Sequence, residues 1–300
     1  MSNGWPANLP ARCLTVREKA ATVAKVTHEA FMSLFQVAFP GFAPSSGMAA
    51  GTGEAGVRLV VGGVHTSRTI MLAELSMLLA AVPAHCGREG YKEAIVGENV
   101  LGKSTASTRR LSDKRLGELY ALDSSFPLFR ILRRLWDLDP ASRPQLALLA
   151  SLSRDRLLRA SAPAVLRLVP GDELRRDAVR NALHAEYPDR LNENTLEKVL
   201  RNTASSWTQA GHLEGRTFKR RRRVEPTPAS LSLALWLGHV VGFRGADLLR
   251  TGWVTALDCT PDRAQELAVE AKRLGLIDVG MSEQVMEFAF GRLVPTNRRR

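Results

Sequence analysis

The sequence has few of the residues that build metal sites and disulfide frameworks. Its three cysteines, Cys13, Cys86 and Cys259, are far apart and show no paired spacing, so a disulfide framework and a thiolate metal site are disfavoured and a reducing cytoplasm is expected. The six histidines form no H-x-x-x-H or H-x-H pair, which leaves a metal site without support. No acid–base pair or nucleophile motif stands out. We therefore expect a protein that is not an enzyme and needs no cofactor.

Long hydrophobic runs are also missing. The two longest apolar stretches, Thr69–Val82 and Leu231–Phe243, are interrupted by Glu74 and His239, and both are shorter than the ~20 residues that cross a bilayer. We expect them to be buried helices and the protein not to insert into a membrane. The N-terminus lacks the basic, apolar and small-residue order of a secretory signal, which also favours a cytoplasmic location.

Acidic residues are too few to balance the basic ones. The sequence contains 42 Lys and Arg against 30 Asp and Glu, for a formal net charge of +12. The excess is concentrated between Arg190 and Arg223, where nine basic and three acidic residues leave a charge of +6. Such a stretch favours anionic partners, with nucleic acid first and an acidic membrane surface second.

Strand patterns are scarce, whereas helical patterns are frequent from Thr66 onward. The segments expected to be helical are Arg68–Val82, Tyr91–Leu101, Thr105–Leu122, Pro127–Leu138, Pro144–Leu152, Asp155–Val169 and Asp172–Glu186. Strands are expected only at Thr217–Val224, Leu276–Val279 and Gln284–Phe290. No internal repeat indicates a solenoid. These patterns predict a mainly α fold, a multi-helix bundle with a winged-helix-like element and few short strands.

Three regions are expected along the chain. Residues 1–64 form an accessory N-terminal segment, with one amphipathic helix over Thr15–Phe39 followed by a Gly/Ala-rich linker. Residues 65–188 form a helical domain that contains a helix-turn-helix-like segment. Residues 189–300 form a winged-helix-like C-terminal domain.

The basic stretch begins with a helix signal. Asn194 and Glu197 have the N-x-x-E spacing of a capping box, which predicts that a helix begins at Asn194. Three- and four-residue steps predict a buried face made of Leu196, Val199, Leu200, Thr203 and Trp207. The opposite face carries residue types that reach phosphates and base edges, namely Lys198, Arg201, Asn202, Ser205 and Gln209.

A glycine turn and a basic ribbon follow this helix. Gly211 is expected to end the helix, and Arg216–Val224 to be extended. Helix, glycine turn and basic ribbon occur in this order in a winged helix. The wing would hold the DNA backbone through Arg216, Lys219, Arg220, Arg221, Arg222 and Arg223. The alternative interpretation is a solvated charged loop beside an ordinary packed helix.

Residues 97–104, Gly-Glu-Asn-Val-Leu-Gly-Lys-Ser, match the phosphate-loop pattern G-x-x-x-x-G-K-[ST]. The context does not fit, because only three apolar residues in a row precede Gly97 and no alternation of strands and helices follows. The better interpretation is a helix ending near Leu101, a Gly-Lys turn and a helix starting at Ser104. This helix-turn-helix outline is either a solvated surface or a second nucleic-acid contact, made by Lys103, Thr105, Arg109 and Arg110.

Four stretches carry a resemblance to a known family. They are Thr66-Ser67-Arg68 before an apolar helix, GENVLGKSTASTRR at 97–110, SLSRDRLLRAS at 151–161 and LNENTLEKVLRNTASSWTQAGHL at 191–213. In this order they resemble the BrxA family, a small helical component of bacteriophage exclusion (BREX) defence systems. The resemblance covers about Thr66 to Val294 and leaves residues 1–64 without a counterpart.

The resemblance implies a helical, non-enzymatic protein with a winged-helix-like DNA-binding part. We therefore expect an accessory subunit that binds double-stranded DNA and works with other BREX proteins. The alternatives are a stand-alone winged-helix transcription regulator, a P-loop NTPase that uses residues 97–104, and a scaffold whose basic run binds RNA or an acidic partner. The NTPase requires a buried strand directly before Gly97, and a helix there would exclude it.

Overall fold

The structure is a computed structural model that describes residues 39–60, 63–187, 191–282 and 285–294. The chain divides into two compact units, Met1–Phe39 and Pro40–Arg300. The helix expected over Thr15–Phe39 falls outside the described residues, apart from its last residue.

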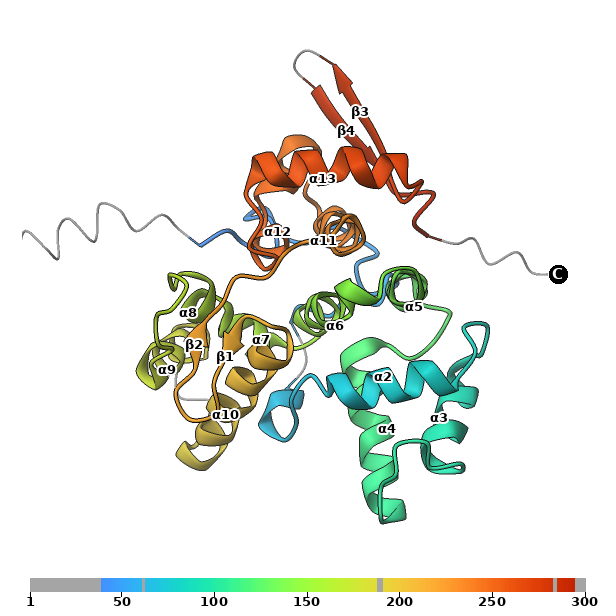
Figure 1. Cartoon of the computed structure of the whole chain (residues 1–300), viewed down its shortest axis with the longest axis vertical. Coiled ribbons are helices and arrows are strands. Elements are labelled where there is room, and N and C mark those ends of the chain that lie inside the picture. The colour runs from blue at the N-terminus through green and yellow to red at the C-terminus, as the bar shows by residue number, and fades with distance from the viewer. Residues whose placement is uncertain (1–38, 61–62, 188–190, 283–284, 295–300) are drawn as a thin grey trace, which may run out of the picture. The chain divides into compact units, whose positions relative to one another are not determined.

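The expected mainly α fold is confirmed (Figure 1). The helices are α2 (Leu72–Ala81), α3 (Arg88–Val96), α4 (Ala106–Tyr120), α5 (Pro127–Leu138), α6 (Arg143–Leu152), α7 (Arg156–Ala160), α8 (Ala162–Leu166), α9 (Arg176–Glu186), α10 (Glu193–Gln209), α11 (Pro228–Val241), α12 (Gly252–Thr255) and α13 (Pro261–Arg273), with 3-10 turns η1 (Val64–Thr66), η2 (Pro140–Ser142) and η3 (Gly245–Arg250). The strands are β1 (Leu213–Glu214), β2 (Arg220–Arg221), β3 (Asp278–Ser282) and β4 (Val285–Ala289). Within these described ranges, no helix is long and apolar enough to span a membrane.

Helix boundaries follow local chemistry. Helix α5 has the expected bounds, with Pro127 at its first position, where the missing N–H costs nothing. The single helix expected over Asp155–Val169 is instead two short helices, α7 and α8. Pro163 near the start of α8 has no N–H to continue the hydrogen-bond ladder of α7.

Helix α2 begins later than expected. Ser67 ends η1 by donating its backbone N–H to Val64 O (2.9 Å), so it does not cap α2. Met71 then has a left-handed backbone (φ 52°) directly before Leu72. The segment between Ser67 and Leu72 contacts α10, where the backbone N–H of Ile70 donates to Ser206 Oγ (3.0 Å).

Helix α11 lies at the centre of the core, as its long apolar stretch predicts. Nearly all its side chains are buried, including those of Leu231, Leu233, Leu235 and Leu237. It packs against α5, α6, α12 and α13. Thr227 and Ser230 form a capping box at its start, which satisfies two backbone N–H groups of the first turn.

The Gly/Ala-rich segment Pro44–Gly56 packs against this core and does not form a free linker. The backbone N–H of Ala49 donates to Val241 O at the end of α11 (3.1 Å), and Ala55 O accepts the N–H of Leu128 in α5 (3.0 Å). Small residues let the backbone approach these helices closely. The Gly/Ala-rich composition alone predicts a linker and does not indicate this packing.

Residues 155–224 form a winged-helix element. Helices α7 and α8 are followed by Glu173, which forms an isolated antiparallel bridge with Arg220, and then by α9, α10, β1 and β2. Strand β2 is the middle strand, since it pairs antiparallel with β1 (Leu213↔Arg221) and also bridges Glu173 through Arg220. With the Glu173 bridge in the place of the first strand, this order of elements is that of a winged helix. The boundary expected at residues 188/189 falls between α9 and α10, inside the element.

A helix followed by an antiparallel hairpin occurs twice in the described chain. We call α10 with β1 and β2 the first helix–hairpin, and α13 with β3 and β4 the second helix–hairpin (Figure 1). In the second, the pairing runs from Asp278↔Ala289 to Ser282↔Val285, so its strands are longer than those of the first. Helix α13 packs on α11 and η3.

Candidate nucleic-acid interface

Helix α10 starts two residues earlier than predicted. Its N-cap is Asn192, whose side-chain oxygen accepts the N–H of Thr195 (2.9 Å), so Asn194 already lies inside the helix. Asparagine is among the best N-cap residues, and the sequence offers two of them here. The predicted helix stop is confirmed, because Gly211 follows the last turn with a positive φ of 88°.

The buried face of α10 is the predicted one. The side chains that face the core include Leu196, Val199, Leu200, Thr203 and Trp207. The indole of Trp207 donates to Ser161 Oγ (2.9 Å), which joins α10 to the end of α7. Burying these apolar side chains fixes the rotation of the helix and thus decides which residues face outward.

The outward face of α10 keeps three of the four predicted contact residues. Lys198 and Arg201 are exposed and Ser205 is half-buried. Asn202 instead donates through its side-chain amide to His65 O (2.8 Å), which ties α10 to η1. Gln209 also has a structural role, since it accepts the backbone N–H of Leu72 (3.1 Å).

The wing loop, residues 215–219, connects β1 and β2. Arg216 in the loop and Arg220 at the start of β2 are exposed, and the guanidinium of Arg220 donates to Gly171 O (3.0 Å). Lys219 closes the loop by donating from Nζ to Gly215 O (2.6 Å). The wing therefore presents positive charge on a short loop that its own hydrogen bonds hold closed.

Arg221 does not face outward as predicted. Its side chain is 2% exposed and forms a buried ion pair with Asp258, whose other oxygen accepts the N–H of Val224 (2.9 Å). The reason is strand geometry, because successive side chains of a strand point to opposite faces. Arg222 and Arg223 are exposed, and Arg222 lies 3.5 Å from the carboxylate of Glu214.

His212 also fastens the base of the wing. Its Nε2 lies 2.9 Å from Ala256 O, so the ring donates to that carbonyl. Complete burial lowers the pKa of His212 to about 4, although the charge of Asp258 acts in the opposite direction. Together His212, Arg221 and Asp258, which we call the wing clamp, join the first helix–hairpin to the segment that leads into α13. No pattern in the sequence indicates that Asp258 belongs to this clamp.

A groove lies between α10 and the wing loop. It has a volume of about 350 Å³ and an apolar floor that includes Leu174, Val179, Leu200 and Ala204. The basic residues that line it are Arg176, Arg201, Arg216 and Lys219. Two predicted parts of the interface, the helix face and the wing, therefore share one concave basic surface.

The acidic residues of α10 are neutralised by α9. Arg180 forms ion pairs with Glu193 (2.8 Å) and Glu197 (2.9 Å), and Arg176 also pairs with Glu197. These contacts hold the two helices of the winged-helix element together. They also reduce the repulsion that the two glutamates would exert on a phosphate near Lys198 or Arg201.

The phosphate-loop hypothesis for residues 97–104 fails its own condition, because helix α3 and not a strand precedes Gly97. Lys103 is ion-paired with Glu74 (3.0 Å), and Thr105 is the N-cap of α4. The guanidinium of Arg109 donates to Val96 O (2.9 Å). Of the four residues of the possible second contact, Arg110 remains exposed without such a bond.

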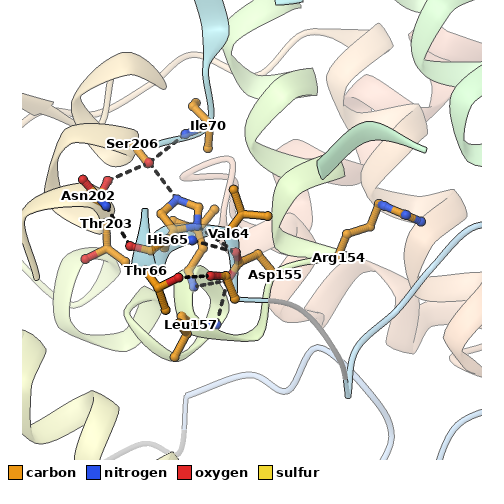
Figure 2. A network of polar contacts seen from close by, with 12 residues as sticks. Val64, His65, Thr66, Ile70, Arg154, Asp155, Leu157, Asn202, Thr203 and Ser206 are labelled. Carbon is orange, nitrogen blue, oxygen red and sulfur yellow. Dashed lines mark hydrogen bonds and ion pairs between the residues drawn. The ribbon is translucent and has the colours of Figure 1, made fainter. Parts of the chain in front are cut away.

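A buried polar network joins η1, α7 and α10, and no sequence motif indicates it (Figure 2). His65 Nε2 lies 2.8 Å from Ser206 Oγ, and His65 Nδ1 lies 3.0 Å from Asp155 Oδ2, though not aligned for a hydrogen bond. Burial alone would raise the pKa of Asp155, but His65 and the backbone N–H groups of Leu158 and His65 outweigh it and lower the pKa to about 2.

This serine–histidine–aspartate order also occurs in hydrolases, where the serine must reach the substrate. Here Ser206, His65 and Asp155 are all completely buried. Ser206 Oγ already accepts the N–H of Ile70 (3.0 Å) and donates to Asn202 O (2.7 Å). The network therefore positions α10 and leaves no oxygen free for attack on a substrate.

The fold and the groove define a mainly α protein with a winged-helix-like element, whose outward helix face and wing loop are basic. No protein-family model matches the chain, and no curated protein matches it. Across the described ranges, no group of three or more His, Cys, Asp or Glu residues could hold a metal ion.

Proposed function

We propose that the protein is a non-enzymatic DNA-binding protein that grips duplex DNA with the first helix–hairpin. The observation that carries this proposal is the shared groove, in which Arg201 of α10 and Arg216 and Lys219 of the wing loop converge. Phosphate contacts supply most of the affinity of such interfaces, and a helix face beside a wing can span neighbouring parts of the DNA backbone.

The charge on this surface is available to DNA. Among the described residues, none forms an ion pair with Lys198, Arg201, Arg216 or Arg223. In the proposed complex α10 lies in the major groove, where Lys198, Arg201 and Ser205 reach base edges and phosphates. Arg216, Lys219, Arg220, Arg222 and Arg223 hold phosphates, whereas Arg221 stays in the wing clamp.

The test is the salt dependence of binding to a short labelled duplex. Arg201→Ala/Arg216→Ala should weaken binding to every duplex sequence and lower the slope of log affinity against log salt by ~0.9 for each phosphate that is no longer neutralised. Arg250→Ala/Arg273→Ala removes the same charge from exposed sites outside the groove and serves as the control. Equal affinity and equal slope for both double variants would contradict the proposal.

The resemblance to the BrxA family extends the proposal to a cellular role. We assign the protein as an accessory subunit that places other BREX proteins on DNA. In a cell that carries such a defence system, removing the chain should restore phage plating. The Arg201→Ala/Arg216→Ala variant should fail to restore defence, whereas the Arg250→Ala/Arg273→Ala control should restore it. Full defence without the chain would reject this role while leaving DNA binding intact.

A further inference from the structure

Phe218 in the wing loop is exposed to an unusual degree. Phe218 is 65% exposed, and among the described residues no other Phe, Tyr or Trp is more than partly exposed. By contrast, Phe129 in α5 and Trp207 in α10 are almost completely buried. Leaving a large apolar side chain in water forgoes its burial energy, so an exposed aromatic side chain on a binding surface calls for a partner.

The wing loop holds Phe218 in place. Gly215 has a positive φ of 95°, and a Cβ atom there would lie 2.1 Å from Phe218 O, so the turn requires glycine. The bond from Lys219 Nζ to Gly215 O (2.6 Å) closes the same turn. The loop is therefore a compact turn between the paired residues Glu214 and Arg220. A ring held on such a turn can enter a partner with little loss of chain entropy.

The residues around Phe218 select the kind of partner. Arg216, Lys219 and Arg220 lie within two residues of it in the chain, and Arg216 and Lys219 also line the basic groove. An apolar protein partner would have to bury these charges without compensation. A membrane surface would need a wider apolar face than one ring. Duplex DNA can contact the cations and the ring together, because phosphates flank its grooves and its stacked bases accept a flat apolar side chain.

We propose that Phe218 enters the minor groove and inserts between two adjacent base pairs, while α10 lies in the neighbouring major groove. This inference rests on the proposed DNA-binding function. Apolar wedges that enter from the minor groove unstack one step and kink the duplex toward the major groove. Pyrimidine–purine steps unstack most easily, so Phe218 gives the complex a preference for flexible steps without any hydrogen bond to a base.

The test uses the full chain and a duplex that reports unstacking and bending together. 2-Aminopurine placed at successive positions brightens when a neighbouring base pair separates, and dyes on the two ends report their approach. With the unaltered chain, both signals should change. Phe218→Ala should lose both and bind about 5- to 20-fold more weakly, with an unchanged salt slope because no charge is removed. Phe218→Leu should keep most of the bend, since an apolar wedge remains.

Thr217→Ala, in the same loop, is the matched control and should keep both signals. Thermal melts of each variant verify that the fold is intact. Unchanged unstacking and bending with Phe218→Ala would overturn the insertion while leaving DNA binding in place. A loss of binding to single-stranded DNA or to anionic vesicles, with the duplex signals unchanged, would overturn it as well. If the unaltered chain does not bind duplex DNA, the proposed function itself fails.

Discussion

The two helix–hairpins share their local design and differ in charge. Each helix begins at a side-chain cap, Asn192 for α10 and Thr260 for α13, and each is followed by a glycine with positive φ, Gly211 (88°) and Gly275 (69°). Residues 190–223 contain nine basic and three acidic residues. Residues 260–290 contain three basic and six acidic residues, a net charge of −3.

This difference in charge shows that two elements with the same order of helix and hairpin can present very different surfaces to a partner. On α13, Arg263 is paired with Glu266 (2.7 Å), and Asp262 and Glu270 are also exposed. A phosphate backbone would meet net repulsion there, although the order of helix and hairpin is the same. Under the proposed function, the side chains on the outward faces decide which of the two elements binds DNA, because similar folds can carry unrelated binding surfaces.

The wing clamp offers the largest effect, because it joins the first helix–hairpin to the segment that leads into α13. Asp258→Asn leaves Arg221 buried without a counter-charge, and asparagine tolerates the positive φ (54°) of this position. We expect the free energy of unfolding to fall by about 3 kcal/mol in urea titrations. Glu214→Gln breaks the exposed pair with Arg222 and should cost less than ~1 kcal/mol. Equal decreases for the two variants would mean that Arg221 is not held by charge.

Acid should weaken the first helix–hairpin through His212. The folded-state pKa of about 4 lies below the ordinary histidine value of 6.5, so the unfolded chain takes up the proton first as the pH falls. Stability is complete above pH ~6.5 and declines toward pH ~4, with a decrease of about 2 kcal/mol between pH 7 and pH 5. His212→Gln should remove this pH dependence from unfolding curves.

His239, which lies next to the second hairpin, provides the comparison for the acid sensitivity of His212. It lines a cavity with Met286 and Phe288 of the second hairpin, and burial followed by the charge of Arg244 lowers its pKa. Because His239 is only partly buried, His239→Gln should remove a smaller share of the acid dependence. A larger share for His239 than for His212 would place the acid-sensitive contact in the second helix–hairpin.

Charge reversal tests the contrast in DNA binding. Arg201→Glu on α10 should weaken duplex binding at least about tenfold, since it removes a cation from the groove and adds an anion. Arg273→Glu makes the same change at an exposed site on α13 and should alter affinity less than about twofold. Fluorescence anisotropy at fixed salt measures both. Comparable weakening by the two variants would mean that the whole surface, and not the groove, attracts DNA.

The smallest expected effect concerns the acidic residues of α10. Glu197→Gln removes a negative charge beside the groove and frees Arg176 from its ion pair. Duplex affinity should rise about two- to threefold, with less than ~1 kcal/mol change in stability. Glu270→Gln removes the same charge from α13, which does not line the groove, and should leave the affinity for duplex DNA unchanged. A decrease with Glu197→Gln would show that α9 must be held in place by this pair.

Periodic patterns in the sequence predicted the local features well. The spacing of Leu196, Val199 and Trp207 is enough to fix the buried face of α10, because a helix repeats every 3.6 residues. Gly211 marks the helix stop for an equally local reason. Helix starts were less certain, since Asn192 and Asn194 are both good caps and the choice depends on the entry of the chain.

Features that depend on distant partners could not be predicted. Asn202 has the residue type of a base-reading side chain, yet it bonds His65 O, 137 residues away. Arg221 looks like its neighbours in sequence, and only its pairing with Leu213 and its contact with Asp258 show that it points inward. For Phe218 the sequence does carry a signal, because this phenylalanine stands within a run of cations. A large apolar side chain there has no core to enter.

The burial of Arg221 has a consequence for how the basic run tolerates mutation. In the sequence, Lys219 to Arg223 look like five equivalent cations. Folding should constrain the buried Arg221, whereas the proposed DNA binding should constrain its exposed neighbours. In a saturation library scored for folding, Arg221 should accept almost no replacement, and not even lysine, whose point charge does not reproduce the guanidinium fork. Arg222 and Arg223 should accept nearly all replacements. When the library is scored for DNA binding, positions 222 and 223 should require only a positive charge, so that lysine replaces arginine freely. Residues that look alike in this stretch of sequence are therefore expected to tolerate different substitutions, because one is buried and its neighbours are exposed.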